Sequence, residues 1–285
     1  MKRTAPPSVT GEWQLALPLT LFFGLFFIGP LLLLLVISFY ADPAMQTWGT
    51  ADQYIQAVAD PINLDVLWDT LILGLKATII CLIVGFPLAW MISRASPRWQ
   101  GLMIFLVILP ILTSVVVRTF AWVVILARRG IINESLMTLG IIDSPLRLLF
   151  DETGVLIVLA QVQMPLMVLP LLTTLQRIDP NLTDASAVLG AGQWRTFWKV
   201  IVPLSVPGMI AGCILVYAAC VTAFVTQTLI GGARNIYMPL FIFQESMDLQ
   251  NWPFAAALSV VFMISVLLVV ALLVTIGRAS KAQPA

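Results

Sequence analysis

The stretch with the most informative residue spacing covers residues 179–203, between two apolar segments. It opens with Asp179 and Pro180, a pair that favours the first turn of a helix. An aspartate there accepts hydrogen bonds from free N–H groups, and a proline has no N–H to satisfy. Gly190 is typical of the left-handed residue that ends a helix. The spacing therefore predicts two short helices joined by the turn Gly190-Ala191-Gly192.

The second predicted helix separates its aromatic and basic residues. Its apolar residues recur at i, i+3, i+4 and i+7, and they are Trp194, Phe197, Trp198 and Ile201. Arg195 and Lys199 fall on a different face. This pattern is typical of an amphipathic helix lying along a membrane, and it leaves two roles open: an anchor in the bilayer interface or a contact surface for another protein.

Few residues in the chain are suited to catalysis. The 285 residues include no histidine, which removes the commonest metal ligand and the usual general base near neutral pH. Cys81, Cys213 and Cys220 stand in apolar stretches and are predicted to pack as small hydrophobic side chains. No lysine follows a glycine as it does in a Walker A motif. We therefore predict no catalytic residue and no metal site, and any ATP must be hydrolysed elsewhere.

The elements that position these residues are strongly apolar. The chain is 60% hydrophobic and 10% charged, with a formal net charge of +1. Soluble domains are about 45–50% apolar and about 25% charged. So few charges cannot coat a surface in water, which indicates that lipid covers much of this one. The near-zero net charge also argues against nucleic-acid binding.

Six charge-free runs predict an all-α integral membrane protein that forms a single transmembrane domain over residues 1–285. The predicted helices lie near residues 15–38, 69–92, 101–122, 154–176, 205–229 and 254–277. Pro110, Pro165 and Pro170 predict kinks inside them. Gly208 and Gly212 have G-x-x-x-G spacing, which favours close helix packing.

The distribution of lysine and arginine predicts that both termini lie in the cytoplasm. With that orientation the inner segments hold nine basic residues: Lys2, Arg3, Arg94, Arg98, Arg177, Arg195, Lys199, Arg278 and Lys281. The outer loops hold four, namely Arg128, Arg129, Arg147 and Arg234. Because cytoplasmic loops are enriched in basic residues, residues 177–203 are predicted to form a cytoplasmic loop.

The cytoplasmic loop resembles that of permease subunits in bacterial ABC importers. Their pattern is E-A-A, three residues, G, nine residues, then I-x-L-P. Asp184, Ala185 and Ser186 stand in the E-A-A positions, Gly190 follows at the same spacing, and Val200, Val202 and Pro203 stand in the I, L and P positions. Residues 109–122, 130–133 and 251–259 are similar to segments of the spermidine/putrescine-type permeases.

This resemblance implies a type I ABC importer permease in a bacterial inner membrane that is not itself an enzyme. It implies a homologous second permease, two copies of a cytoplasmic ATPase that binds ATP and Mg²⁺, and a periplasmic solute-binding protein. The implied solute is a polyamine or a related amine or amino-acid-like compound. The loop corresponds to the coupling helix that docks in a groove of the ATPase, so the implied coupling residues are Asp184, Ala185, Ser186, Gly190, Trp194, Val200 and Pro203.

Polar residues within the spans are candidates for the solute pathway, because unpaired polar groups are costly in lipid. These candidates are Arg118, Gln161, Gln163, Tyr217, Thr222 and Thr226. Hydrogen bonds between helices are an equally good explanation for each glutamine and threonine. Lys76 is expected to extend toward the outer surface. An autonomous secondary transporter or channel is the alternative function, but we find no carboxylate in the spans to relay ions.

Overall fold

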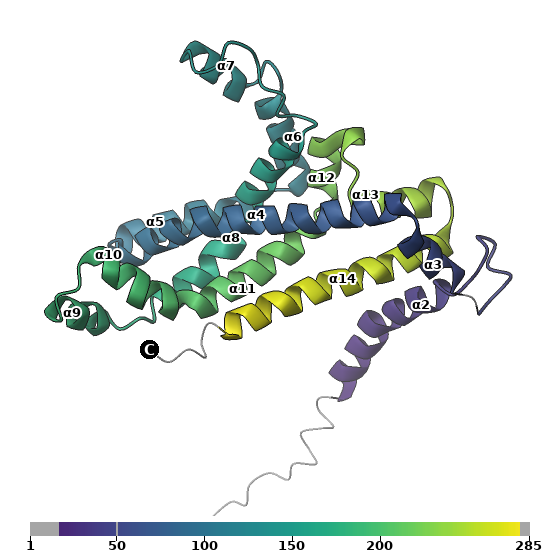
Figure 1. Cartoon of the computed structure of the whole chain (residues 1–285), viewed down its shortest axis with the longest axis horizontal. Coiled ribbons are helices and arrows are strands. Elements are labelled where there is room, and N and C mark those ends of the chain that lie inside the picture. Colours follow the sequence, from purple (N-terminus) through teal and green to yellow (C-terminus); the bar gives the residue numbers. More distant parts are fainter. Residues whose placement is uncertain (1–16, 50, 280–285) are drawn as a thin grey trace, which may run out of the picture. The chain divides into compact units, whose positions relative to one another are not determined.

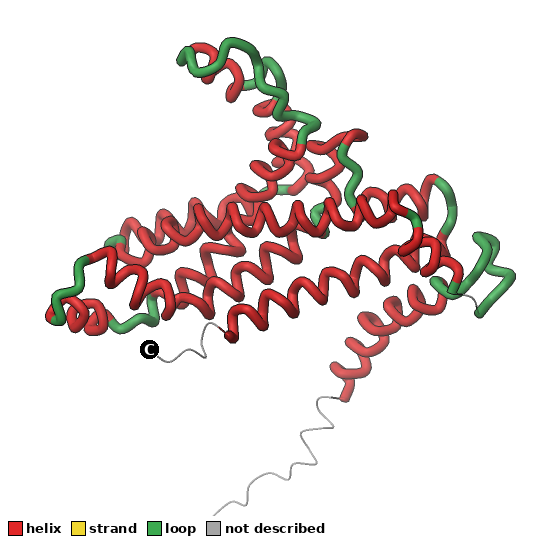
Figure 2. Tube along the Cα trace, in the orientation of Figure 1, coloured by secondary structure: helices red, strands yellow, loops and turns green. Residues whose placement is uncertain are grey.

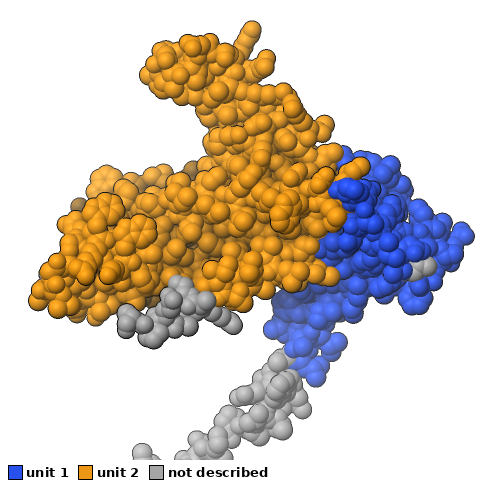
Figure 3. Space-filling model, viewed as in Figure 1, with its two compact units in different colours: residues 1–61, 242–261 blue, residues 62–241, 262–285 orange. Residues whose placement is uncertain are grey.

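A computed structural model describes residues 17–49 and 51–279. The chain divides into two compact units, one made of residues 1–61 and 242–261 and the other of residues 62–241 and 262–285 (Figure 3). The described residues are helices and loops, and the one β-type pairing among them is an isolated bridge between Tyr40 and Trp48.

The first described element of the first unit is an apolar helical stretch, Leu17–Ile37, whose most apolar part has no buried residue. Lipid or another subunit must therefore cover it. After it, the hydroxyl groups of Ser38 and Tyr54 lie 2.5 Å apart, and the side-chain amide of Gln53 donates to the carbonyl of Ala41 at 2.8 Å. The elements of this unit are η1 (Gly24–Ile28), α2 (Gly29–Ile37), α3 (Asp52–Ala59), η5 (Gln244–Asp248), and parts of α13 (Met238–Phe243) and α14 (Trp252–Ala279).

The second unit contains the remaining helices (Figures 1 and 2). They are α4 (Pro61–Arg94), α5 (Pro97–Ile108), η2 (Leu109–Leu112), α6 (Val115–Leu126), α7 (Ile131–Thr138), α8 (Glu152–Leu175), α9 (Pro180–Val188), α10 (Gln193–Thr196), η3 (Phe197–Ile201), α11 (Val202–Val221), α12 (Phe224–Gly231) and η4 (Gly232–Arg234). In Figure 1, α6 and α7 extend away from the layer formed by α4, α8 and α11.

Glycines allow α4, α8 and α11 to pack closely in the core of this unit. A Cβ atom on Gly208 of α11 would lie 2.5 Å from Thr174 Oγ1 and 2.8 Å from the Pro170 carbonyl oxygen, both on α8. A Cβ on Gly212 would meet Met167 Sδ at 2.7 Å. The close packing predicted from the G-x-x-x-G spacing is thus confirmed.

The predicted burial of Cys81 and Cys220 is confirmed too, while Cys213 is half-buried.

A Gly208→Val substitution should lower the thermal unfolding midpoint of the detergent-solubilised chain. The new Cβ would clash with a backbone carbonyl that cannot rotate away, and overpacking of this kind costs about 1–3 kcal/mol. Gly101→Val is the matched control, because a Cβ on Gly101 of α5 meets no atom within 4 Å. Equal midpoints for the two variants would contradict the packing account.

Four of the six predicted spans correspond to single long helical stretches. They are Leu17–Ile37, Pro61–Arg94, Glu152–Leu175 and Trp252–Gly277. Residues 15 and 16 of the first prediction lie outside the described residues. Because α4 begins at Pro61 instead of residue 69, it includes Asp65 as well as Asp69, the first residue of the predicted span. Our expectation of spans without any carboxylate was therefore wrong for this helix.

The single helix predicted over residues 101–122, with a kink at Pro110, is instead two separate helical pieces. The first piece, Pro97–Leu112, and the second, Val115–Thr138, are bent by 99° relative to each other. Between them Thr113 is extended and Ser114 is also non-helical. Pro110 cannot donate a backbone hydrogen bond, and the Arg118 guanidinium donates to the Pro110 carbonyl oxygen. The Arg118 side chain, which follows the bend, thus donates a hydrogen bond to the Pro110 carbonyl, which precedes the bend.

The helix predicted over residues 205–229 is also interrupted. One continuous helical stretch extends from Gln193 to Val221, which is the last residue of α11. After Thr222 and Ala223 the chain re-enters a helix at Phe224. No proline or glycine stands at this break, so the residues that most often interrupt helices gave no indication of it.

Candidate functional site

Residues 177–203, here called the coupling segment, form the two short helices that the sequence predicts. Asp179 Oδ1 accepts a hydrogen bond from the Asn181 N–H at 2.9 Å at the start of α9. Gly190 has a φ of +79°, and the Ala191 N–H donates to the Ser186 carbonyl at 3.0 Å. This is the hydrogen bond of a Schellman turn, which requires a left-handed residue. The turn at Gly190 is therefore as predicted.

A hydrogen bond between side chains ties the two short helices together. The hydroxyl groups of Ser186 on α9 and Thr196 on α10 lie 2.7 Å apart. Thr196 is buried, so loss of this contact would leave its hydroxyl without this hydrogen-bond partner. Ser186, one of the two residues that depart from the E-A-A pattern, thus contributes to fixing the angle between α9 and α10.

The predicted aromatic face of the second helix is divided by the structure. Phe197 packs against Phe86 and Trp90 of α4, with ring centroids 5.7 and 5.5 Å away, and Ile201 is buried. Trp194 and Trp198 are instead 78% and 62% exposed. Residues 197–201 form a π-helical turn, whose i→i+5 bonding changes the angular spacing between Phe197 and Ile201. A single amphipathic stripe was therefore the wrong description.

The tip of the coupling segment exposes apolar side chains. Val188 and Leu189, immediately before Gly190, are 88% and 87% exposed, and Trp194 follows the turn. Asp184, Ala185 and Pro203 are also exposed, whereas Val200 is half-buried. These side chains leave an uncovered surface on both sides of the Gly190 turn.

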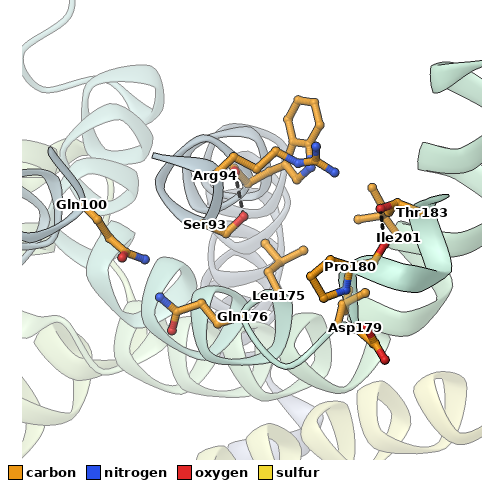
Figure 4. A pocket seen from close by; sticks show the side chains of 11 residues that line it. Ser93, Arg94, Gln100, Leu175, Gln176, Asp179, Pro180, Thr183 and Ile201 are labelled. Carbon is orange, nitrogen blue, oxygen red and sulfur yellow. Dashed lines mark hydrogen bonds between the residues drawn. The ribbon is translucent and has the colours of Figure 1, made fainter. Parts of the chain in front are cut away.

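A pocket of about 450 Å³ lies between the coupling segment and the ends of the long helices (Figure 4). Its wall includes Arg94 at the end of α4, Gln100 of α5, Gln176 after α8, and Asp179 and Thr183 of the coupling segment. The Arg94 guanidinium lies over the Trp90 ring, 5.2 Å from its centroid.

None of the six candidate pathway residues lines this pocket. Gln161 Oε1 accepts a hydrogen bond from Trp122 Nε1 of α6 at 3.2 Å. Tyr217 is fully buried, and its hydroxyl has no hydrogen-bond partner within the part of the chain that the structure describes. Its ring packs against α4, where a Cβ on Gly74 would lie 3.1 Å away. Thr226 is buried on α12.

The carbonyl groups at the end of α11 are satisfied by side chains, and two of the six candidates take part. Gln163 Nε2 donates to the Ala219 carbonyl at 3.4 Å, and Thr222 Oγ1 donates to that of Ala218 at 2.8 Å. Gln227 Nε2 donates to the carbonyls of Cys220 and Val221, at 2.8 and 3.4 Å. Because helix ends in lipid need internal partners, these amides and this hydroxyl make the break in the fifth span possible.

Sequence reasoning missed Gln227, which is buried at the break. Its flanking residues Thr226 and Thr228 gave a signal, since three consecutive polar side chains interrupt an apolar run there.

Both cations of the spans also have partners. Lys76 Nζ forms an ion pair with Glu152 Oε1 at 2.5 Å, and Arg118 bonds to Pro110.

An Arg118→Gln substitution should lower the thermal unfolding midpoint of the purified transporter and leave the apparent affinity for solute unchanged. The guanidinium satisfies a carbonyl at the bend, and charge-assisted bonds of this kind contribute about 1.5–3 kcal/mol. Arg128→Gln, at an exposed position after α6, is the control. A changed affinity at normal thermal stability would instead indicate direct contact between Arg118 and the solute.

Long apolar helices and broken spans define a multi-pass helical membrane protein, and its helical hairpin carries an exposed apolar tip. The sequence matches the family described as "Binding-protein-dependent transport system inner membrane component" over residues 12–279. The chain belongs to this family, which comprises the permease subunits of ABC importers.

Individual relatives support the same assignment. The chain is 36% identical over 211 residues to the spermidine/putrescine transport system permease protein PotB of Escherichia coli (strain K12), covering 74% of this chain and 76% of that protein. It is 30% identical over 184 residues to the molybdenum transport system permease protein ModB of Azotobacter vinelandii, covering 63% and 80%. A bacterial alginate ABC transporter, solved in complex with an alginate-pentasaccharide-bound periplasmic protein, matches with a TM-score of 0.79 at 16% identity, covering 97% of this chain and 98% of that one.

These matches establish the general function. The protein is a multi-pass inner-membrane permease subunit of an ABC importer, with the fold of a type I permease. It is not an enzyme, because ATP hydrolysis in such importers is carried out by a separate subunit.

Proposed function

We propose that this permease forms half of the membrane pathway for a polyamine such as spermidine or putrescine, or for a related amine. The observation that carries the proposal is 36% identity to a spermidine/putrescine permease across three quarters of both chains. Each of the two cations in the spans has a partner within the chain, Glu152 for Lys76 and the Pro110 carbonyl for Arg118, which agrees with a solute that is not an anion.

We propose that the remaining subunits are a homologous second permease, two cytoplasmic ATPases that bind ATP and Mg²⁺, and a periplasmic solute-binding protein. Both termini lie in the cytoplasm, and this chain itself binds no cofactor. The coupling segment docks in a groove of an ATPase through Val188, Leu189 and Trp194. Their exposure supports this role, since aromatic and aliphatic anchors supply most of the binding energy at interfaces.

Within the membrane, the six polar candidates line the pathway or support it. Thr222 is the exposed member at the end of α11, and Gln163 holds the same helix end from α8. The exposed Thr222 hydroxyl at this break can accept a hydrogen bond from an amine, without a fixed carboxylate.

Uptake by the complete importer in proteoliposomes tests the solute. With its binding protein and internal ATP, the complex should accumulate radiolabelled spermidine or putrescine, and molybdate should not compete. ATP-dependent uptake of molybdate without polyamine uptake would overturn the proposed solute. Uptake that follows an ion gradient and ignores ATP would support the alternative, an autonomous secondary transporter.

A further inference from the structure

The pocket in Figure 4 lies where four membrane spans end. Trp90 and Arg94 belong to the last turns of α4, Gln100 to the first turns of α5, and Gln176 follows the last turn of α8. Ile201 closes the pocket from the start of the fifth span. Ends of spans lie at the bilayer surface, where lipid headgroups are found. The pocket therefore opens at headgroup level.

The segments around this pocket have an excess of positive charge. The end of α4, the start of α5 and the residues between α8 and α11 include five cations, Arg94, Arg98, Arg177, Arg195 and Lys199. They include two carboxylates, Asp179 and Asp184. Clusters of basic residues next to membrane spans attract anionic lipids.

Hydrogen-bond donors on three different helical elements surround the pocket. Arg94 is stacked on Trp90 and belongs to no ion pair within the described residues. The side-chain amides of Gln100 and Gln176 lie on another side of the pocket (Figure 4). The carboxylate of Asp179 points away from Arg94 and accepts a hydrogen bond from Asn181. Arg94 is thus left available to a ligand.

We propose that this pocket binds the phosphate-bearing headgroup of an anionic phospholipid. Arginine is well suited to phosphate oxygens, and its stem can follow the Trp90 ring while its charge stays at the surface. The volume of about 450 Å³ falls in the range of about 300–1,000 Å³ that is usual for small-ligand sites.

The bound headgroup would contact the coupling segment as well as the spans. Pro180 and Thr183 of α9 and Ile201 of η3 form part of the same wall. The lipid therefore stabilises one position of α9 against the ends of α4 and α8. This consequence for ATP hydrolysis rests on the proposed function, whereas lipid binding itself does not.

The test compares Arg94→Gln with Arg98→Gln in the purified complex. Arg98 carries the same charge four residues away and does not line the pocket. Native mass spectrometry during titration with phosphatidylglycerol should show binding about tenfold weaker for Arg94→Gln and unchanged for Arg98→Gln. A Gln100→Leu, Gln176→Leu double variant should weaken binding as well, and thermal unfolding midpoints identify any variant that fails to fold.

Three outcomes would overturn the lipid site. The first is equal phosphatidylglycerol retention by Arg94→Gln and Arg98→Gln. The second is displacement of the lipid by millimolar inorganic phosphate, which would assign the site to a soluble phosphate. The third is loss of the lipid from the wild-type permease when the ATPase is added, which would show that a protein side chain fills the pocket. If Arg94→Gln loses phosphatidylglycerol and Arg98→Gln retains it, while solute-dependent ATP hydrolysis is unchanged in both, the lipid site is supported and only its link to coupling is removed.

Discussion

Gly190→Val in the assembled importer is expected to reduce ATP-driven solute uptake about tenfold or more, with membrane insertion unchanged. Gly190 has a φ of +79°, and no atom lies within 4 Å of a Cβ placed there. The effect is therefore purely conformational. A β-branched residue in this region costs about 1–3 kcal/mol, and each 1.4 kcal/mol corresponds to about tenfold. Valine should shift the turn and change the angle between α9 and α10.

Gly192→Val is a closely matched control for this prediction. Gly192 lies two residues away, its φ is −69°, and a Cβ on it also meets open space. Valine can adopt that backbone without strain, so uptake should stay near the wild-type rate. If Gly190→Val inserts normally and sustains wild-type uptake and solute-stimulated ATP hydrolysis, the coupling role assigned to this turn is refuted.

Replacing both Val188 and Leu189 with aspartate should weaken association with the ATPase by on the order of a hundredfold or more. Burial of an aliphatic side chain contributes about 1.5–3 kcal/mol, and the two residues are 88% and 87% exposed in the isolated chain. Charges at these positions would also have to be desolvated on docking. The measurement is recovery of the ATPase with affinity-tagged permease from detergent.

A second pair of exposed apolar residues provides the control. Leu139 and Ile141, after α7, are 72% and 64% exposed. Aspartate at both positions should leave ATPase recovery unchanged, because this loop lies on the side of the membrane predicted to be outside. Equal recovery with both double variants would show that the tip of the coupling segment does not bind the ATPase.

Spans could be predicted from the sequence because length and apolar composition alone determine whether a helix can cross a bilayer. Pro110 predicted a kink in the third span, but neither the full break there nor the break after Val221 could be predicted. At the first break Arg118 donates to the Pro110 carbonyl, and beside the second Gln163 of α8 donates to the Ala219 carbonyl. Such hydrogen bonds arise only once the helices are packed, so no local spacing in the sequence indicates them.

In the coupling segment too, some features could be predicted from the sequence and others could not. Its Gly190 turn was predictable, because the need for a left-handed residue is local. The contact between Ser186 and Thr196 was not, since it depends on how α9 folds back on α10. Nor were the π-helical turn at residues 197–201 and the packing of Phe197 against α4 with Trp198 left exposed.

Photo-crosslinking from Leu189 tests most directly whether the coupling segment docks on the ATPase. A photoreactive amino acid replaces Leu189 in one sample and Leu139 in another, and each complete importer is irradiated in nanodiscs. We predict that residue 189 crosslinks to the ATPase subunit and that residue 139 does not. Crosslinks from residue 189 to lipid alone, with the ATPase present and active, would contradict the account and identify the segment as an interfacial anchor.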